Sequence, residues 1–275
     1  MEAPIVTLTT DWGDRDFFVA KVKGRLYGSI PGVRVVDLSH GQSWNDIATA
    51  ANVVRYGCME FPKGTVHIVD IGYDPAQADA TNGAPKQSLL VSYHGHYIVC
   101  SNRRLLEVAL DDGCDTVTAL PFPTETKSCS FLAYDQYCDI VAALVGGADV
   151  RELGLPCEPL RRRPVLQAQL DGDILETMVI YKDSYGNVDL NITYEEFEAV
   201  RAGRRFRVEL GRFIGGGERF EDISSVSRHY NDVHMGDLLL TVSSTGYLQL
   251  AVNKDSIAKL LGLSYASKCR FFFAS

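Results

Sequence analysis

Short apolar runs alternate with helix-like patterns through the first half of the chain, and this alternation constrains the fold more than any other feature. Apolar runs at residues 5–9, 33–38 and 65–71 predict strands, and residues 17–27 and 45–56 predict helices between them. Strands that alternate with helices are typical of βαβ units joined by right-handed crossovers. The first half therefore predicts an α/β domain with a mainly parallel sheet.

The alternating pattern ends near residue 156, where prolines and arginines replace it. Before that point, residues 88–93 and 96–100 flank His94-Gly95 and predict a hairpin added to the sheet, and residues 135–144 predict a further helix. We expect an α/β domain at residues 1–155, a linker at 156–164 and a smaller, all-β, barrel-like domain at 165–275. The second half contains predicted strands at 166–170, 176–182, 188–192, 205–210, 237–242, 247–252 and 270–273, and a short helix at 256–261.

Composition excludes several classes of partner. The 275 residues carry a net charge of -8, and the longest uninterrupted basic run is Arg161-Arg162-Arg163, so we expect no nucleic-acid partner. No run of eighteen apolar residues and no signal-peptide pattern is present, which predicts a cytoplasmic protein without a membrane span. The seven cysteines form no C-x-x-C pair, which favours reduced thiols over disulfides or a zinc site.

The stretch Asp11-Trp12-Gly13 follows the first predicted strand without a spacer. An aspartate followed by a glycine is an ordinary way to turn out of a strand and cap the next helix. An acid beyond the carboxyl end of a strand is also well placed to accept hydrogen bonds from a ribose diol. The stretch alone leaves both interpretations open.

Familiar cofactor and metal motifs are absent. No G-x-G-x-x-G or P-loop follows a strand, and His94-x-His96 has no third ligand at a suitable spacing. We therefore expect neither a metal nor a cofactor.

Six segments, in order, resemble one family, the S-adenosyl-L-methionine (SAM) hydroxide adenosyltransferases, which are relatives of the fluorinase and chlorinase enzymes. The first looks like that family's T-D-F-G opening, with Trp12 where phenylalanine is usual. The six segments are TLTTDWGDRDFFVAKVKG, VRVVDLSHGQSWNDIATAA, FPKGTVHIVD, YKDSYGNVDLN, HYNDVHMGDLL and SSTGYLQLAVNKDSIAKLLGL. The resemblance covers nearly the whole chain.

The resemblance implies a Rossmann-like first domain, a β-rich second domain and a homotrimer whose ligand sites lie between subunits. It implies that SAM is the substrate, that Asp11 holds the ribose and that Trp12 and Trp44 wall the ribose and the reacting carbon. The remaining matched positions are Asp183 and Ser244 for the methionine end, and Tyr185, Asn187, Tyr230, Val252 and Lys254 for adenine.

The resemblance to the family fails at the positions that would hold the nucleophilic water. Asp70 meets the family's aspartate only if two residues are deleted, and no arginine follows it. Leu132 stands opposite the family's histidine and Tyr134 opposite an arginine. Arg103 and Arg104 appear in an altered loop, and we hypothesise that one of them supplies the missing positive charge.

Two functions remain open from the sequence. The first is a divergent SAM hydrolase that gives adenosine and L-methionine by in-line attack of water or hydroxide on the 5′ carbon. The second is a weakened relative that binds SAM or adenosine as a sensor or scavenger. The hydrolase is the function that we predict, and a related enzyme acting on another adenosine compound is also open.

Overall fold

The computed structural model describes residues 3–43, 46–72, 88–110, 114–121, 131–162, 167–210, 219–221 and 223–274, the segment 219–221 by its backbone alone. The chain divides into two compact units, Met1–Arg163 and Pro164–Ser275. Each unit has its own hydrophobic core.

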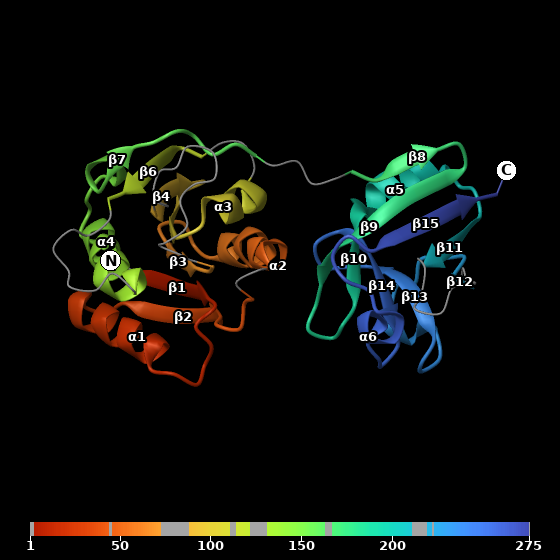
Figure 1. Cartoon of the computed structure of the whole chain (residues 1–275), viewed down its shortest axis with the longest axis horizontal. Helices are drawn as coiled ribbons and strands as arrows, with labels where there is room; N and C mark the ends of the chain where they lie inside the picture. Colours follow the sequence, from red (N-terminus) through yellow and green to blue (C-terminus); the bar gives the residue numbers. More distant parts are fainter. Residues whose placement is uncertain are drawn as a thin grey trace. The chain divides into compact units, whose positions relative to one another are not determined.

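The first unit is built on a seven-stranded sheet in the order β2-β1-β3-β5-β4-β6-β7 (Figure 1). The pairs β1–β2, β1–β3 and β3–β5 are parallel, whereas β4–β5, β4–β6 and β6–β7 are antiparallel. The strands are β1 (Ile5–Thr10), β2 (Arg34–Ser39), β3 (Val66–Asp70), β4 (Ser88–Tyr93), β5 (His96–Cys100), β6 (Thr116–Leu120) and β7 (Leu155–Pro156). The prediction of a mainly parallel sheet was wrong: the sheet is mixed, because β4, β6 and β7 extend it in alternating directions.

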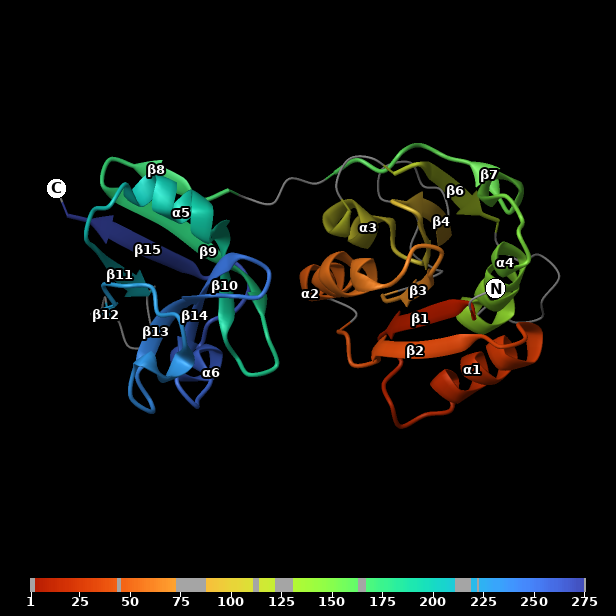
Figure 2. The same ribbon diagram turned by 180° about the vertical axis from the view of Figure 1, so that it is seen from behind.

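Helices cover both faces of this sheet (Figure 1, Figure 2). One face packs against α1 and α4 through Leu26 and Val141, and the other against α2 and α3 through Ala50 and Leu106. The helices are α1 (Phe18–Ser29), α2 (Ile47–Asn52), α3 (Arg103–Ala109) and α4 (Cys138–Val145), with π-helical turns at Val53–Gly57 and Ala133–Tyr137 beside α2 and α4. Alternate residues of β3, β4 and β5 enter the two cores, so these strands are largely apolar on both faces.

The second unit is an antiparallel sheet that curls into half a barrel (Figure 2). The curl is made along β9, whose first half pairs with β15 and whose second half pairs with β10. The strands are β8 (Gln169–Asp171), β9 (Ile174–Lys182), β10 (Val188–Thr193), β11 (Phe206–Leu210), β12 (Arg219–Glu221), β13 (Leu238–Val242), β14 (Tyr247–Val252) and β15 (Lys268–Phe273). Side chains on the concave face form one core.

The second unit is not all-β, because it contains α5 (Tyr194–Arg201) and α6 (Ile257–Leu261). The start of α5 is a capping box: the Glu196 amide donates to Thr193 Oγ1 at 3.2 Å, and the Thr193 amide donates to Glu196 Oε2 at 2.9 Å. Phe197 is fully buried against Phe206 and Phe271. The capping box and this single aromatic anchor hold a helix of only eight residues.

A buried polar chain crosses the first sheet at β1, β3 and β5. Thr7 Oγ1 lies 2.7 Å from His67 Nδ1, and His67 Nε2 lies 3.1 Å from His96 Nδ1. His67 has no solvent exposure. Burial, helped by the nearby His96, lowers the pKa of His67 to about 3, so the ring is neutral in the folded protein at neutral pH.

We expect His67 to cost the first unit stability in acid. The unfolded chain binds a proton at this ring near pH 6.5 and the folded chain does not, so stability falls as pH drops below 6.5. The free energy of unfolding of the wild type, relative to His67→Gln, should fall by about 1.4 kcal/mol per pH unit between pH 6 and pH 4. Urea unfolding at several pH values measures this slope, and the exposed His234→Gln serves as the control. A pH-independent difference between wild type and His67→Gln would contradict the assignment.

Candidate active site

Two acidic side chains lie together at the carboxyl ends of β1 and β3. Asp11 follows β1 directly, and its Oδ2 accepts a hydrogen bond of 2.8 Å from the amide of Gly72, which lies just beyond β3. The Asp11 amide donates to the Asp70 carbonyl at 3.3 Å. Because β1 and β3 are parallel neighbours, their carboxyl ends lie side by side. Residues 59 positions apart in the sequence therefore meet at the same end of the sheet. Asp11 therefore both ties the two strand ends together and faces the edge where open α/β sheets bind ligands.

Trp12 connects to Asp70 directly. Its indole Nε1 donates to Asp70 Oδ2 at 3.0 Å. The indole stacks on the His40 ring at 6.2 Å between centroids and meets the Phe131 ring edge-on at 5.0 Å. His40 is in turn fixed by Thr10, whose Oγ1 lies 2.8 Å from His40 Nδ1. The orientation of the indole is thus set by packing on both sides as well as by its hydrogen bond.

Asp70 is the most perturbed carboxyl of this edge. Its side chain is buried, and Oδ1 forms no hydrogen bond of normal geometry within the described residues. Burial raises the pKa of Asp70 to about 6, with a smaller contribution from the Asp11 charge, while Trp12 and Ser101 oppose part of the rise. A carboxyl that titrates near pH 6 at a sheet edge can take a proton from water at neutral pH.

The two arginines of the altered loop lie in the first turn of α3, which Asn102 caps by accepting from the Leu105 amide at 3.2 Å. The Arg103 guanidinium donates to the carbonyls of Glu158 and Pro159 at 2.9 and 2.6 Å and to Glu107 Oε1 at 3.1 Å. Arg104 is exposed. Arg103 thus anchors the end of the first unit to α3, and Arg104 is the arginine of the pair that faces solvent.

The segment opposite the family's histidine and arginine is part of the core. Leu132 and Ala133 are buried among the side chains of α1 and α4. The Tyr134 ring lies under the Lys21 ammonium at 4.0 Å and the Arg25 guanidinium at 4.8 Å. These residues therefore add packing and a cation-aromatic cluster, not a histidine or an arginine. Trp44 lies outside the described residues.

In the second unit, a tight turn gathers Asp183, Tyr185 and Asn187. Asp183 Oδ1 accepts from the Tyr185 and Asn187 amides, both at 2.9 Å, and Asp183 Oδ2 accepts from Asn187 Nδ2 at 2.9 Å. Gly186 has a φ of +86°, and a Cβ there would lie 1.9 Å from Ser256 Oγ. The Gly186 carbonyl also accepts from the Ala258 amide at 3.0 Å. Only glycine allows this turn to pack on the start of α6.

Three of the other predicted positions of the second unit, Val252, Lys254 and Tyr230, lie around this turn. Val252 ends β14 and forms an isolated bridge with Asp255, and Lys254 between them has a φ of +63°. Burial raises the pKa of Tyr230, with further contributions from the Asp183 and Asp189 charges, which places the phenol near both acids. Ser244 is exposed in the turn between β13 and β14. The turns at 183–187 and 252–256 and Tyr230 therefore form one cluster.

Sequence reasoning missed Asp189 and Gln249 beneath this cluster. Gln249 Nε2 donates to Asp189 Oδ1 at 2.8 Å, and Tyr230 Oη donates to Gln249 Oε1 at 2.6 Å. Burial raises the pKa of Asp189 to about 6. The sequence feature that could have indicated this pair was an acidic residue, Asp189, within the alternating apolar pattern of β10.

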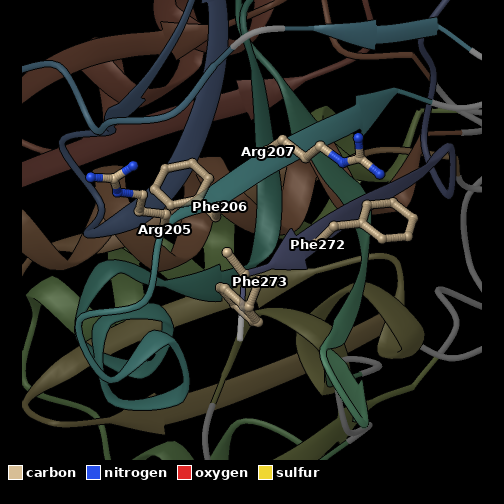
Figure 3. A pocket seen from close by; sticks show the side chains of 6 residues that line it. Arg205, Phe206, Arg207, Phe272 and Phe273 are labelled. Carbon is tan, nitrogen blue, oxygen red and sulfur yellow. The ribbon is translucent and has the colours of Figure 1, made fainter.

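An open cavity of about 470 Å³ lies elsewhere in the second unit, between the start of β11 and the end of β15 (Figure 3). Arg207 lies over Phe272 at 5.4 Å, and Phe273 forms the floor. None of the predicted site residues lines this cavity. Among the described residues no group of three His, Cys, Asp or Glu side chains has a metal-binding arrangement, and no described helix is long and apolar enough to cross a membrane.

Several curated proteins are similar to this chain over nearly its whole length. The chain is 28% identical over 274 residues to a (R)-S-adenosyl-L-methionine hydrolase of Salinispora tropica, with 97% of each chain covered. It is 23% identical to a protein of that name from Methanocaldococcus jannaschii, over 98% of this chain and 96% of the relative, and 25% identical to a fluorinase of an Actinoplanes species, with 93% of each covered.

Solved structures share the fold over nearly the whole chain. An uncharacterized conserved protein from Thermotoga maritima superimposes with a TM-score of 0.77 at 21% identity, covering 98% of this chain and 99% of that one. A conserved hypothetical protein from Thermus thermophilus gives 0.67 at 24% identity, covering 98% and 100%. The family model of the SAM hydroxide adenosyltransferase N-terminal domain matches residues 6–154, and that of the C-terminal domain matches residues 177–270. The chain therefore belongs to the SAM hydroxide adenosyltransferase family.

Proposed function

We propose that this protein hydrolyses SAM to adenosine and L-methionine. The observation that carries the proposal is the match to SAM hydrolases over nearly the full length of both chains. The carboxylates at the carboxyl ends of β1 and β3 give that match a chemical basis. SAM is the substrate, and the reaction as written needs no cofactor.

The reaction is an in-line displacement at the 5′ carbon. A bond forms between C5′ and the oxygen of water, the bond from C5′ to the sulfonium sulfur breaks, and its electron pair leaves with neutral methionine. Because the cationic sulfonium becomes a neutral thioether, the protein contributes mainly alignment and a dry surrounding for the nucleophile. One proton of the water must be removed.

Asp70 is the proposed acceptor of that proton. Its pKa near 6 keeps it ionised at pH 8, and its burial limits competing hydrogen bonds to water. The Trp12 indole holds Oδ2, so Oδ1 is the oxygen offered to the nucleophile.

Asp11 is proposed to hold the ribose. One carboxylate oxygen, Oδ2, is used by the Gly72 amide, and the other can accept from a ribose hydroxyl. Trp12 and Trp44 are proposed to enclose the sugar. In the second unit, Asp183 and Ser244 are proposed for the methionine end and Tyr185, Asn187, Tyr230, Val252 and Lys254 for adenine.

A binding protein without turnover is the second candidate, and the core position of residues 132–134 favours it. Leu132 and Ala133 are buried and apolar, so neither gives a group that could orient water. Arg103 donates to four partners, which leaves Arg104 as the better candidate for a replacement charge. Arg104→Ala should lower turnover if that charge is used.

A homotrimer is also proposed, with exposed aromatic and apolar side chains as its support. Tyr185 is 82% exposed, Met235 75% and Tyr230 44%. A partner subunit would cover such a surface. Light scattering should then give a mass of three times the 30.3 kDa chain.

The first experiment is titration calorimetry of the wild type with SAM and with adenosine, followed by chromatography of the cell contents. We expect binding of SAM with release of adenosine and methionine in equal amounts. Binding without products would establish the ligand-holding alternative, and the absence of binding to either compound would contradict both.

A further inference from the structure

Three polar residues form a row across the sheet of the second unit. Asp189 on β10 lies directly opposite Gln249 on β14, and Gln249 lies directly opposite Thr241 on β13. Their neighbours along the strands, such as Leu190 and Leu250, belong to the core, so the polar row points to the other face of the sheet. All three side chains are nevertheless about 95% buried, since their exposed fractions are 4%, 5% and 5%.

The segment 226–232 covers the polar row. Thr241 Oγ1 donates to the Ser227 carbonyl at 3.0 Å, and the Ser227 amide donates to the Leu240 carbonyl at 2.7 Å. Further along the segment, Tyr230 donates to Gln249. Tyr230 itself lies on a three-residue 3₁₀ turn, Tyr230–Asp232, outside the sheet ladder. Its ring depends on side-chain contacts for its orientation.

Asp189 decides which way the Gln249 amide points. An ionised carboxylate can only accept hydrogen bonds, so the Gln249 NH₂ group must face Asp189 Oδ1, as it does at 2.8 Å. The Gln249 carbonyl oxygen is then turned to Tyr230, and the phenol must donate to it, at 2.6 Å. The three groups form one directed chain of hydrogen bonds. At pH 8 the carboxyl is ionised, because its pKa is about 6.

We propose that Asp189 is a positioning residue that holds the Tyr230 ring, through Gln249, in the orientation that receives the adenine of the substrate. The proposal rests on the proposed function for the identity of the ligand, but the hydrogen-bond chain exists without ligand. A ring that is oriented in advance loses less freedom when the ligand arrives. Asp189 therefore acts on binding and not on the displacement at the 5′ carbon.

Asp189→Asn tests the chain with little change in shape. Asparagine can present either its oxygen or its NH₂ group to Gln249, so the amide of Gln249 loses its preferred direction. At pH 8 we expect KM for SAM to rise about five- to tenfold with kcat within about twofold of wild type, since uniform binding is what is lost. Tyr230→Phe, which keeps the ring and removes only the donor, should give a similar rise.

The double variant Asp189→Asn/Tyr230→Phe distinguishes positioning from general damage. If Asp189 acts through the Tyr230 hydroxyl, the double variant should have the KM of the Tyr230→Phe variant alone. Multiplying effects would overturn the proposal, and so would a fall in kcat without a rise in KM. Thr177→Val is the matched control, because it removes another buried hydrogen bond of this unit, to the Cys269 carbonyl, away from Tyr230. We expect it to leave KM unchanged.

A measurement on the protein without ligand tests this proposal independently of the proposed function. The amides of Arg228 and His229 are protected by Asp232 Oδ2 in the covering segment, at 2.9 and 3.0 Å. Hydrogen exchange of the peptide 226–233 should be faster in Asp189→Asn and Tyr230→Phe and unchanged in Thr177→Val. Unchanged exchange in both test variants overturns the positioning role. If the wild type neither binds nor hydrolyses SAM while exchange responds as expected, the proposed function fails and the hydrogen-bond chain stands.

Discussion

Asp70→Asn is expected to stabilise the first unit at pH 8 while lowering SAM hydrolysis by a factor of about a hundred to ten thousand. The loss of rate follows from removal of the proposed base, because asparagine cannot take a proton from water. The gain in stability follows from burial, because an amide needs no ionisation. The hydrogen bond from Trp12 Nε1 survives, since the asparagine oxygen can accept it.

The size of the gain depends on pH in a defined direction. The pKa of Asp70 is raised from 3.8 to about 6, so the folded state binds its proton more tightly than the unfolded state. The contribution of Asp70 to the free energy of unfolding is therefore fully present below pH 3.8 and is lost as the pH rises through 6. The difference between variant and wild type should be near zero at pH 4 and about 3 kcal/mol at pH 8.

Tryptophan fluorescence reports this change for the first unit alone, because both tryptophans of the chain, Trp12 and Trp44, lie there. Urea unfolding at pH 4 and pH 8 gives the two free energies. Asp14→Asn is the matched control, since Asp14 is an exposed carboxylate in the segment that follows β1 and should change stability by less than about 0.5 kcal/mol. An equal difference at both pH values would show that Asp70 titrates normally.

Gly186→Ala is expected to destabilise the second unit by about 3 kcal/mol and to weaken SAM binding at least about tenfold. The added Cβ meets Ser256 Oγ at 1.9 Å, and the φ of +86° is unfavourable for any L side chain. The turn must therefore move away from α6, and Asp183, Tyr185 and Asn187 must move with it. Far-UV circular dichroism during denaturation measures the stability, with the first unit followed separately by fluorescence.

Gly172→Ala separates the two causes. Gly172 also has a positive φ, of +57°, but nothing lies within 4 Å of an added Cβ. This variant should cost only the backbone strain, about 1 kcal/mol, and leave ligand binding unchanged. Adding Ser256→Gly to Gly186→Ala should restore part of the loss, because it removes the nearest clashing atom. Equal costs for the two glycine variants would rule out the packing argument.

Local patterns predicted most of the strands. The hairpin β4–β5 and the strand β14 begin and end at the predicted residues. The strands β1, β10 and β13 differ by one residue at one end, and β3 differs by one residue at each end. Such strands are recognisable because apolar alternation and turn residues act over a few positions. The comparisons confirm the family that the six segments indicated.

Long-range pairing and the short helices α3 and α5 were beyond such patterns, although the short helix α6 was predicted at 256–261. The direction of β6 is set by its antiparallel contact with β4, which no local sequence feature encodes, and α5 and α3 each span fewer than nine residues. Their stability comes from caps at Thr193 and Asn102 and from tertiary packing. The mixed sheet was missed for the same reason.

Parts of the candidate site were accessible and parts were not. Asp11 and Asp70 meet because parallel strands end at the same edge, which the βαβ pattern implies. The pairing of Asp189 with Gln249 depends on the register of two strands 60 positions apart, so the sequence alone gave no reason to connect them.

Strand β3 contains, within four residues, two buried groups whose protonation changes in opposite directions on unfolding. His67 stays unprotonated where the unfolded chain would take up a proton, and Asp70 keeps a proton where the unfolded chain would release one. Between about pH 4 and pH 6, unfolding therefore adds a proton at His67 and removes one at Asp70, so the net uptake of protons from solution is small. These opposite effects largely cancel, so mild acidification shifts the folded population far less than either residue would alone. Substitution of either residue should reveal the pH dependence of stability that the other one causes.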